Sequence, residues 1–128
     1  MANISTFGPD VQLIWKDRKR YCGLPLSFTR YYLIRKPGVW VKLIEDIGFF
    51  TSKIEEVNLF RVEDIEVFAS FANKFWGVGN VTVRSSDKTC PELTLVRIKD
   101  AQKVRSLIMD LVEDERKNRN LHYGEFSQ

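Results

Sequence analysis

The chain has 128 residues, 44% hydrophobic and 29% charged, a composition that suits one ordered globular domain and excludes a low-complexity chain. Every apolar run is interrupted well short of the roughly 18 residues that a membrane-spanning helix needs. The net charge of +3 is too small by itself to indicate nucleic-acid binding.

Charge is distributed unevenly along the chain. Residues 1–53 carry nine Lys and Arg against four acidic residues, whereas residues 54–100 carry six against eight. The first residues show neither the basic region nor the apolar core of a secretory signal, so we expect a cytoplasmic protein, at most peripheral at the inner face of the membrane. In that compartment Cys22 and Cys90 are expected to be free thiols.

The first 27 residues show weak periodicity, and Gly23-Leu24-Pro25 breaks any regular element there, so we expect an arm that lies over a sheet. Strand signals then follow one another closely. Pro37-Gly38 suits the central pair of a type II turn, and Glu45-Asp46 is expected to form the next turn. Seven strands are expected, at residues 28–34, 39–44, 47–54, 55–60, 65–70, 81–84 and 93–98.

One long helix ends this pattern. After a single helical turn at residues 71–76, the chain has no further helical signal until Asp100, where an apolar stripe at helical spacing begins and continues to Lys117. Asp100 is expected to cap this helix. We expect a folded domain at residues 28–118 and a flexible tail at 119–128. The fold class is therefore mainly β, with a sheet that wraps on itself and a C-terminal helix that closes one open end.

Several stretches, in this order and spacing, carry a resemblance to a known family. They are Leu24–Thr29, Phe75–Gly79, Ser85–Thr89 followed by Pro91-Glu92, and the closing helix with Leu111-Val112-Glu113. Over about residues 14–118 the chain resembles the bacterial pleckstrin-homology (PH) domains of the small membrane-associated kind. The resemblance implies a roll of two nearly orthogonal antiparallel sheets, with seven strands and a capping C-terminal helix. It also implies a binding module, but PH-like folds bind phosphoinositides or proteins, so the fold alone does not choose.

The stretch from Trp15 to Tyr21 is the first candidate site. Four cations lie between these two aromatic residues: Lys16, Arg18, Lys19 and Arg20. Lys and Arg are attracted to anionic membranes, and Trp and Tyr prefer the membrane interface. The alternative interpretation is a solvated face on which Trp15 packs against the domain.

A second candidate is the first hairpin, which carries Arg35, Lys36 and Lys42. Lipid-binding members of the resembled family hold phosphates with basic residues in this region. Side chains near a hairpin turn lie close together, so these three could converge on one anion. The alternative is ordinary basic residues that protect an edge strand.

The aromatic residues between positions 31 and 76 are expected to lie mostly in the core. They are Tyr31, Tyr32, Trp40, Phe49, Phe50, Phe60, Phe68, Phe71, Phe75 and Trp76. In the adjacent pairs Tyr31-Tyr32 and Phe49-Phe50, one member must face away from the core. Such an outward aromatic would mark a surface for self-association or for a protein partner.

Catalytic signals are weak. The only histidine is His122, so neither a histidine-based triad nor a multi-histidine metal site is expected, and no cofactor is expected. The sequence therefore predicts a non-enzymatic binding or scaffolding module that acts through protein partners or as a homo-oligomer. The alternative is peripheral binding to anionic membrane lipid through the two basic candidates. The acidic middle segment argues against nucleic-acid binding.

Overall fold

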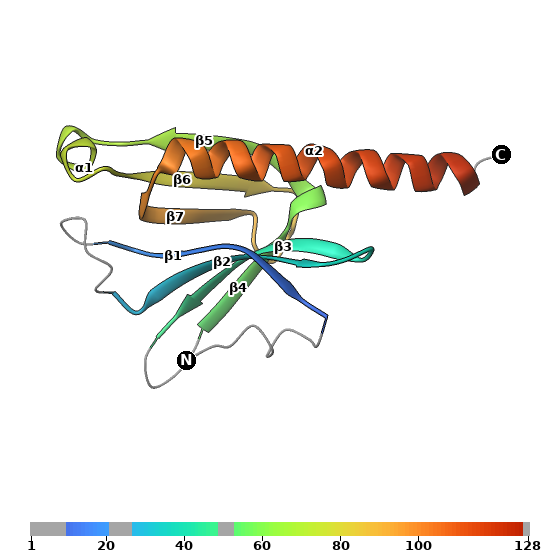
Figure 1. Ribbon diagram of the computed structural model, residues 1–128, viewed down its shortest axis with the longest axis horizontal. Helices are drawn as coiled ribbons and strands as arrows, with labels where there is room; N and C mark the ends of the chain where they lie inside the picture. The colour runs from blue at the N-terminus through green and yellow to red at the C-terminus, as the bar shows by residue number, and fades with distance from the viewer. Residues whose placement is uncertain (1–9, 21–26, 49–52, 127–128) are drawn as a thin grey trace.

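The computed structural model describes residues 10–20, 27–48 and 53–126, which form two antiparallel sheets and a long C-terminal helix (Figure 1). The first sheet has the strand order β1-β2-β3-β4, and the second has the order β5-β6-β7. This arrangement confirms the expected mainly β, PH-like fold. The elements are β1 (Gln12–Arg18), β2 (Thr29–Lys36), β3 (Trp40–Ile47), β4 (Lys53–Asn58), η2 (Leu59–Arg61), β5 (Val62–Phe68), α1 (Phe71–Phe75), β6 (Val78–Ser85), β7 (Glu92–Lys99) and α2 (Ala101–Phe126).

Between the two sheets lies the main core, built from alternate residues of the strands and from one stripe of α2. Tyr31 and Leu33 of β2 both face this space and are almost completely buried. The phenolic oxygen of Tyr31 accepts a hydrogen bond from the backbone N–H of Val96 at 3.0 Å, so it links the two sheets. Burial raises the pKa of Tyr31 to about 12.

The turn between β2 and β3 has the expected form. The N–H of Val39 donates to the carbonyl of Lys36 at 3.0 Å, and Gly38 adopts a φ of 76°. Pro37 presets φ at the first central position, and glycine is the residue that adopts a positive φ at the second without steric cost. The type II turn is therefore confirmed.

The arm expected at the N-terminus is partly wrong, because residues 12–18 form the edge strand β1. Its register on β2 runs from Gln12 opposite Arg35 to Arg18 opposite Arg30. A register shift between Leu13 and Trp15 places both Ile14 and Trp15 against the main core. This bulge breaks the strict alternation by which a strand is recognised in a sequence.

The turn expected at Glu45-Asp46 is also wrong, since both residues lie within β3. Asp46 is completely buried, and its carboxylate lies 4.0 Å from the guanidinium of Arg30 on the neighbouring strand. The two strands expected at residues 47–54 and 55–60 are replaced by β4 alone, which is followed by η2. The described residues still form seven strands, because β1 takes the place of the strand that is lost.

The closing helix is longer than expected, because α2 continues through the segment expected to be a flexible tail and ends at Phe126. At its start, the carbonyl of Asp100 accepts a hydrogen bond from Val104 N–H at 3.0 Å, and Asp100 has a φ of 54°. The expected apolar stripe is confirmed as part of the main core. Its buried residues are Ala101, Val104, Ile108, Leu111 and Val112.

Tyr31 and Tyr32 do face opposite sides of the first sheet, but neither is exposed. Tyr32 belongs to a second small cluster with Ile34 and Ile44, on the side of the sheet that faces away from the main core. Leu13 and Trp40 pack against this cluster. The expected outward-facing aromatic surface is therefore wrong for this pair. The pair Phe49-Phe50 lies outside the described residues.

Candidate functional site

Asp17, near the end of β1, fixes the position of the N-terminal basic run. Its carboxylate is only 8% exposed and accepts hydrogen bonds from Arg18 N–H at 2.8 Å and Lys99 N–H at 2.9 Å. It also forms an ion pair with Arg20 at 3.1 Å. Because Lys99 ends β7, this one carboxylate holds the basic run of the first sheet beside the start of α2.

A pocket of about 320 Å³ lies where these elements meet, and we call it the basic pocket. Trp15, Val104 and Leu107 form its apolar part, and Trp15 also packs against the main core. Four cations and two acidic residues supply its charges. They are Lys16, Arg20, Lys99, Lys103, Asp17 and Asp100. The carboxylate of Asp17 is already engaged by its own neighbours, so the remaining balance at the rim is positive.

The other members of the N-terminal candidate site lie elsewhere. Arg18 pairs in register with Arg30, on the opposite side of the sheet from Asp17. Lys19 is held through its backbone, since its N–H donates to the carbonyl of Thr29 at 3.0 Å. Tyr21 lies outside the described residues. Lys16 and Arg20 therefore line the basic pocket, whereas Arg18 does not.

The backbone of Arg20 is fixed against β7. Its N–H donates to the carbonyl of Arg97 at 3.0 Å, and the Arg97 Nε donates back to the carbonyl of Arg20 at 3.0 Å. Arg97 itself has a φ of 48°, and its N–H donates to the Asn80 side chain at 2.9 Å. This irregular point in β7 lies opposite the register shift in β6, and it provides the second attachment between the basic run and the other sheet.

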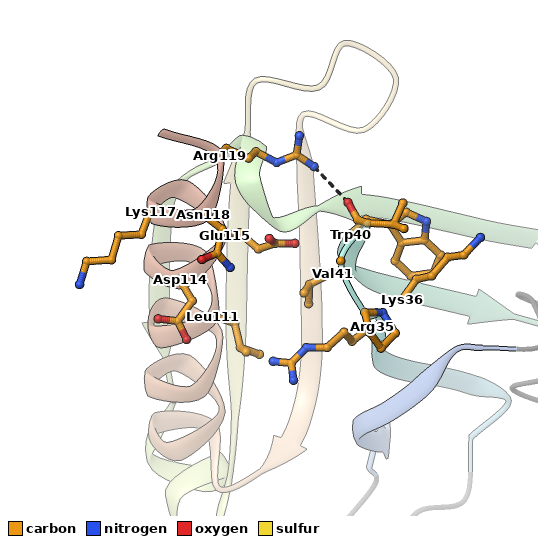
Figure 2. A pocket seen from close by; sticks show the side chains of 13 residues that line it. Arg35, Lys36, Trp40, Val41, Leu111, Asp114, Glu115, Lys117, Asn118 and Arg119 are labelled. Carbon is orange, nitrogen blue, oxygen red and sulfur yellow. Dashed lines mark hydrogen bonds between the residues drawn. The ribbon is translucent and has the colours of Figure 1, made fainter. Parts of the chain in front are cut away.

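The first hairpin borders a different groove, of about 730 Å³, between the β2–β3 turn and the C-terminal half of α2. Figure 2 shows Arg35 pointing across this groove toward Leu111, while Lys36 and Trp40 lie on the other side of the hairpin. Arg119 reaches across from α2 and donates to the carbonyl of Val39 at 3.5 Å. The acidic residues Asp114 and Glu115 also line the groove, so its charge is mixed.

Lys42 does not join Arg35 and Lys36. Its ammonium group forms an ion pair with Glu56 at 3.1 Å and lies 4.6 Å from the ring centroid of Trp40. The three hairpin cations therefore do not converge on one anion. They also lie at the opposite end of β2 from the basic pocket, so the two basic candidates do not form one site.

A group of aromatic residues around α1 is exposed, although these residues were expected in the core. We call this group the aromatic tip; its exposed fractions are 63% for Phe68, 90% for Phe71, 77% for Phe75 and 48% for Trp76. The rings of Phe75 and Trp76 meet edge to face, with centroids 5.2 Å apart. The tip lies between the end of β5 and the start of β6, beyond the point where α2 begins, so α2 does not cover it (Figure 1).

The aromatic tip and the basic pocket lie at the same end of the molecule. Val78, two residues after Trp76, pairs in register with Lys99. Lys99 in turn binds Asp17 and lines the basic pocket. The exposed Lys74 of α1 adds a further cation to this end. Sequence reasoning missed the connection because it depends on contacts between residues far apart in the chain.

Acidic residues gather instead on the outer side of the second sheet. There Arg84 forms ion pairs with Asp64 at 3.2 Å, Glu66 at 3.1 Å and Glu92 at 3.6 Å. Three carboxylates around one guanidinium leave this surface negative. Among the described residues, no group of three or more His, Cys, Asp or Glu is placed to hold a metal ion.

Comparison with known families finds a match to the bacterial PH domain over residues 24–112. The chain belongs to the bacterial PH domain family. Searches of curated proteins and of solved structures found no match. PH domains are generally non-catalytic binding modules. In this PH domain, β1 and the last part of α2 lie outside the matched residues, so the family match covers only part of the basic pocket.

In the part of this PH domain that the structure describes, no helix has both the length and the apolar character needed to span a bilayer.

Cys90 is a buried free thiol, and burial raises its pKa. Ser85 donates its hydroxyl hydrogen to the carbonyl of Cys90 at 2.9 Å. Ser85 therefore supports the β6–β7 turn, consistent with a structural role.

Proposed function

We propose that this PH domain is a non-catalytic binding module that attaches to the anionic surface of a membrane through its basic pocket. One observation carries the proposal: the carboxylate of Asp17 holds β1 against Lys99 and so gathers Lys16 and Arg20 beside Lys99 and Lys103. Cations from two separate parts of the sequence thereby lie around one pocket.

The strength of this attachment follows from the exposed charges. Lys16, Lys74, Lys99 and Lys103 are all exposed at this end. A Lys or Arg near an anionic membrane contributes about 1 kcal/mol. Four lysines therefore contribute about 4 kcal/mol, which corresponds to a dissociation constant of about 1 mM. Charge alone thus supports reversible, salt-sensitive binding.

The distribution of acidic residues favours one orientation on the membrane. The carboxylates around Arg84 lie on the outer side of β5–β7, away from the basic pocket, and would be repelled by an anionic surface. The domain would therefore approach with its basic end first.

Co-sedimentation with vesicles of phosphatidylserine and phosphatidylcholine tests this proposal. Reversing two pocket charges, Lys99→Glu with Lys103→Glu, should weaken binding at least about twentyfold, since each lysine contributes about 1 kcal/mol. The control reverses two exposed lysines elsewhere, Lys88→Glu with Lys117→Glu, and leaves the net charge identical to that of the first variant. Equal loss in both variants would indicate a general charge effect and would contradict a defined basic end.

A second candidate is self-association or binding of a protein partner. The observation that favours it is the presence, on one molecule, of a positive end and of the negative surface around Arg84, which would attract one another between copies. Sedimentation velocity at low and physiological salt tests this candidate without lipid. Self-association predicts a concentration-dependent increase in the sedimenting mass that disappears as the salt concentration rises.

A further inference from the structure

We propose that the aromatic tip enters the interfacial layer of an anionic membrane while the basic pocket beside it holds the lipid headgroups. This inference rests on the membrane attachment proposed above and assigns the part of the molecule that supplies its apolar contribution. Neither the fold nor the family match assigns any role to these side chains.

The exposure of the tip is unusual for its composition. Four large aromatic side chains between Phe68 and Trp76 are each at least 48% exposed, and Phe71 is 90% exposed. Single exposed apolar residues are common on protein surfaces, but a contiguous group of this kind marks an interaction surface. Phe and Trp are also the residues that enter membrane interfaces most readily.

Backbone hydrogen bonds give the tip a defined shape. Lys74 N–H donates to the carbonyl of Ser70 at 2.9 Å, and Gly77 N–H donates to the carbonyl of Lys74 at 3.1 Å. The Ser70 hydroxyl accepts from Asn73 N–H at 3.2 Å. The aromatic rings are therefore presented by an ordered turn, and their ordering on binding costs less than it would for a disordered loop.

Close packing also fixes the base of the tip relative to the basic pocket. A Cβ atom on Gly79 would lie 3.0 Å from the Cβ of Ala101, so β6 and the first residue of α2 are in direct contact. Lys103 lies two residues farther along α2 and lines the basic pocket. The tip and the pocket are therefore fixed in position relative to each other.

Charge identifies a membrane as the occupant. The sequence from residue 67 to residue 86 has no Asp or Glu, while Lys74 lies within the tip itself. Lys99 and Lys103 flank the tip on β7 and α2. An aromatic segment that contains no acidic residue and is flanked by lysines complements a bilayer with an apolar interior and an anionic surface. The charges alone give only millimolar affinity, so stable attachment needs a second contribution.

Substitution of the two most exposed rings tests the insertion. Phe71→Ser and Phe75→Ser should each weaken binding to phosphatidylserine-containing vesicles by about tenfold. Transfer of a phenylalanine side chain out of water raises the affinity by about one order of magnitude or more. Val39→Ser is the matched control, since Val39 is 54% exposed at the tip of the β2–β3 turn, at the other end of the molecule. This control should bind like the unaltered domain. Circular dichroism checks that each variant keeps its fold.

Fluorescence supplies an independent readout of depth. Lipids brominated on their acyl chains should quench the tryptophan emission of the unaltered domain, and Trp76→Phe should remove most of that quenching. Trp15 and Trp40, which are partly buried against the two clusters, should contribute little.

The outcomes separate the two proposals. Salt-sensitive binding that Phe71→Ser and Phe75→Ser weaken, together with quenching of Trp76, supports insertion. Salt-sensitive binding that these variants leave unchanged, without quenching, overturns insertion but leaves surface attachment through the basic pocket intact. Failure of the unaltered domain to bind any vesicle overturns both. Lipid-independent self-association that the same variants abolish would assign the tip to a contact between copies and would also overturn insertion.

Discussion

The carboxylate of Asp17 accepts a hydrogen bond from the backbone N–H of Lys99 at 2.9 Å, which joins the edge strand of one sheet to the last strand of the other. The same carboxylate pairs with Arg20 at 3.1 Å. One acidic residue therefore both closes the roll at this end and determines where the neighbouring cations lie. Its removal should affect stability and binding together.

Asp17→Ala should lower the free energy of unfolding by about 2–3 kcal/mol, because it removes a nearly buried acceptor of charge-assisted hydrogen bonds and leaves its donors unpaired. Urea denaturation measures this change. Asp64→Ala is the matched control, since Asp64 pairs with Arg84 on an exposed surface, and its loss should cost less than about 1 kcal/mol. Similar losses in the two variants would show that Asp17 does not link the sheets.

Tyr31→Phe should cost about 1–2 kcal/mol, because Val96 N–H loses its acceptor between the sheets while the ring continues to fill the core. Chemical denaturation near neutral pH gives this value. An unchanged stability would mean that Val96 N–H finds another partner.

The stability of the domain should also fall in alkaline solution through Tyr31. Burial raises the pKa of Tyr31 from 10 in the unfolded chain to about 12 in the folded domain. The neutral phenol is thus favoured by folding, and its contribution is complete below pH 10 and is lost as the pH rises toward 12. The loss of stability between these pH values should be smaller in Tyr31→Phe by about 2 kcal/mol. Equal pH dependence in both proteins would contradict the assignment.

Gly79→Ala should destabilise the domain by about 1–2 kcal/mol, because the added Cβ would lie 3.0 Å from that of Ala101 and 3.4 Å from that of Ala69. A double-mutant cycle with Ala101→Gly checks the cause. If the contact with Ala101 is responsible, the two substitutions together should cost less than the sum of their separate effects. Additive costs would contradict it.

The first hairpin should contribute little to membrane binding, although its basic residues were a candidate anion-binding site in the sequence. Arg35→Gln with Lys36→Gln removes two cations at the opposite end of β2 from the basic pocket. We expect less than about a twofold change in vesicle binding, since charges more than a Debye length of about 10 Å from the surface are largely screened. A loss as large as that of Lys99→Gln with Lys103→Gln would place the membrane surface at the hairpin instead.

Local sequence signals predicted the elements that depend on local chemistry. Pro37-Gly38 formed the expected turn, and the stripe from Ala101 to Val112 formed the expected buried face of α2. By contrast, β1 was missed because the bulge at Ile14 interrupts its alternation. The turn predicted at Asp46 does not form, because the burial of Asp46 beside Arg30 depends on strand pairing that the sequence does not show.

The candidate site was predictable only in part for the same reason. Lys16 and Arg20 belonged to a visible basic run, but Lys99 and Lys103 join them through contacts between the two sheets. Phe71, with its neighbours in the aromatic tip, was assigned to the core because aromatic residues are usually buried. Its exposure follows from where α2 begins, which a residue-by-residue reading does not reveal.

Vesicle co-sedimentation of the unaltered domain, with phosphatidylcholine alone and with added phosphatidylserine, tests the central claim most directly. We predict that the domain pellets only with the anionic vesicles at low salt, and that binding falls as the salt concentration rises to about 0.15 M, because exposed charges are screened. Pelleting that is equal on neutral and anionic vesicles, or absent from both, would contradict attachment through the basic pocket.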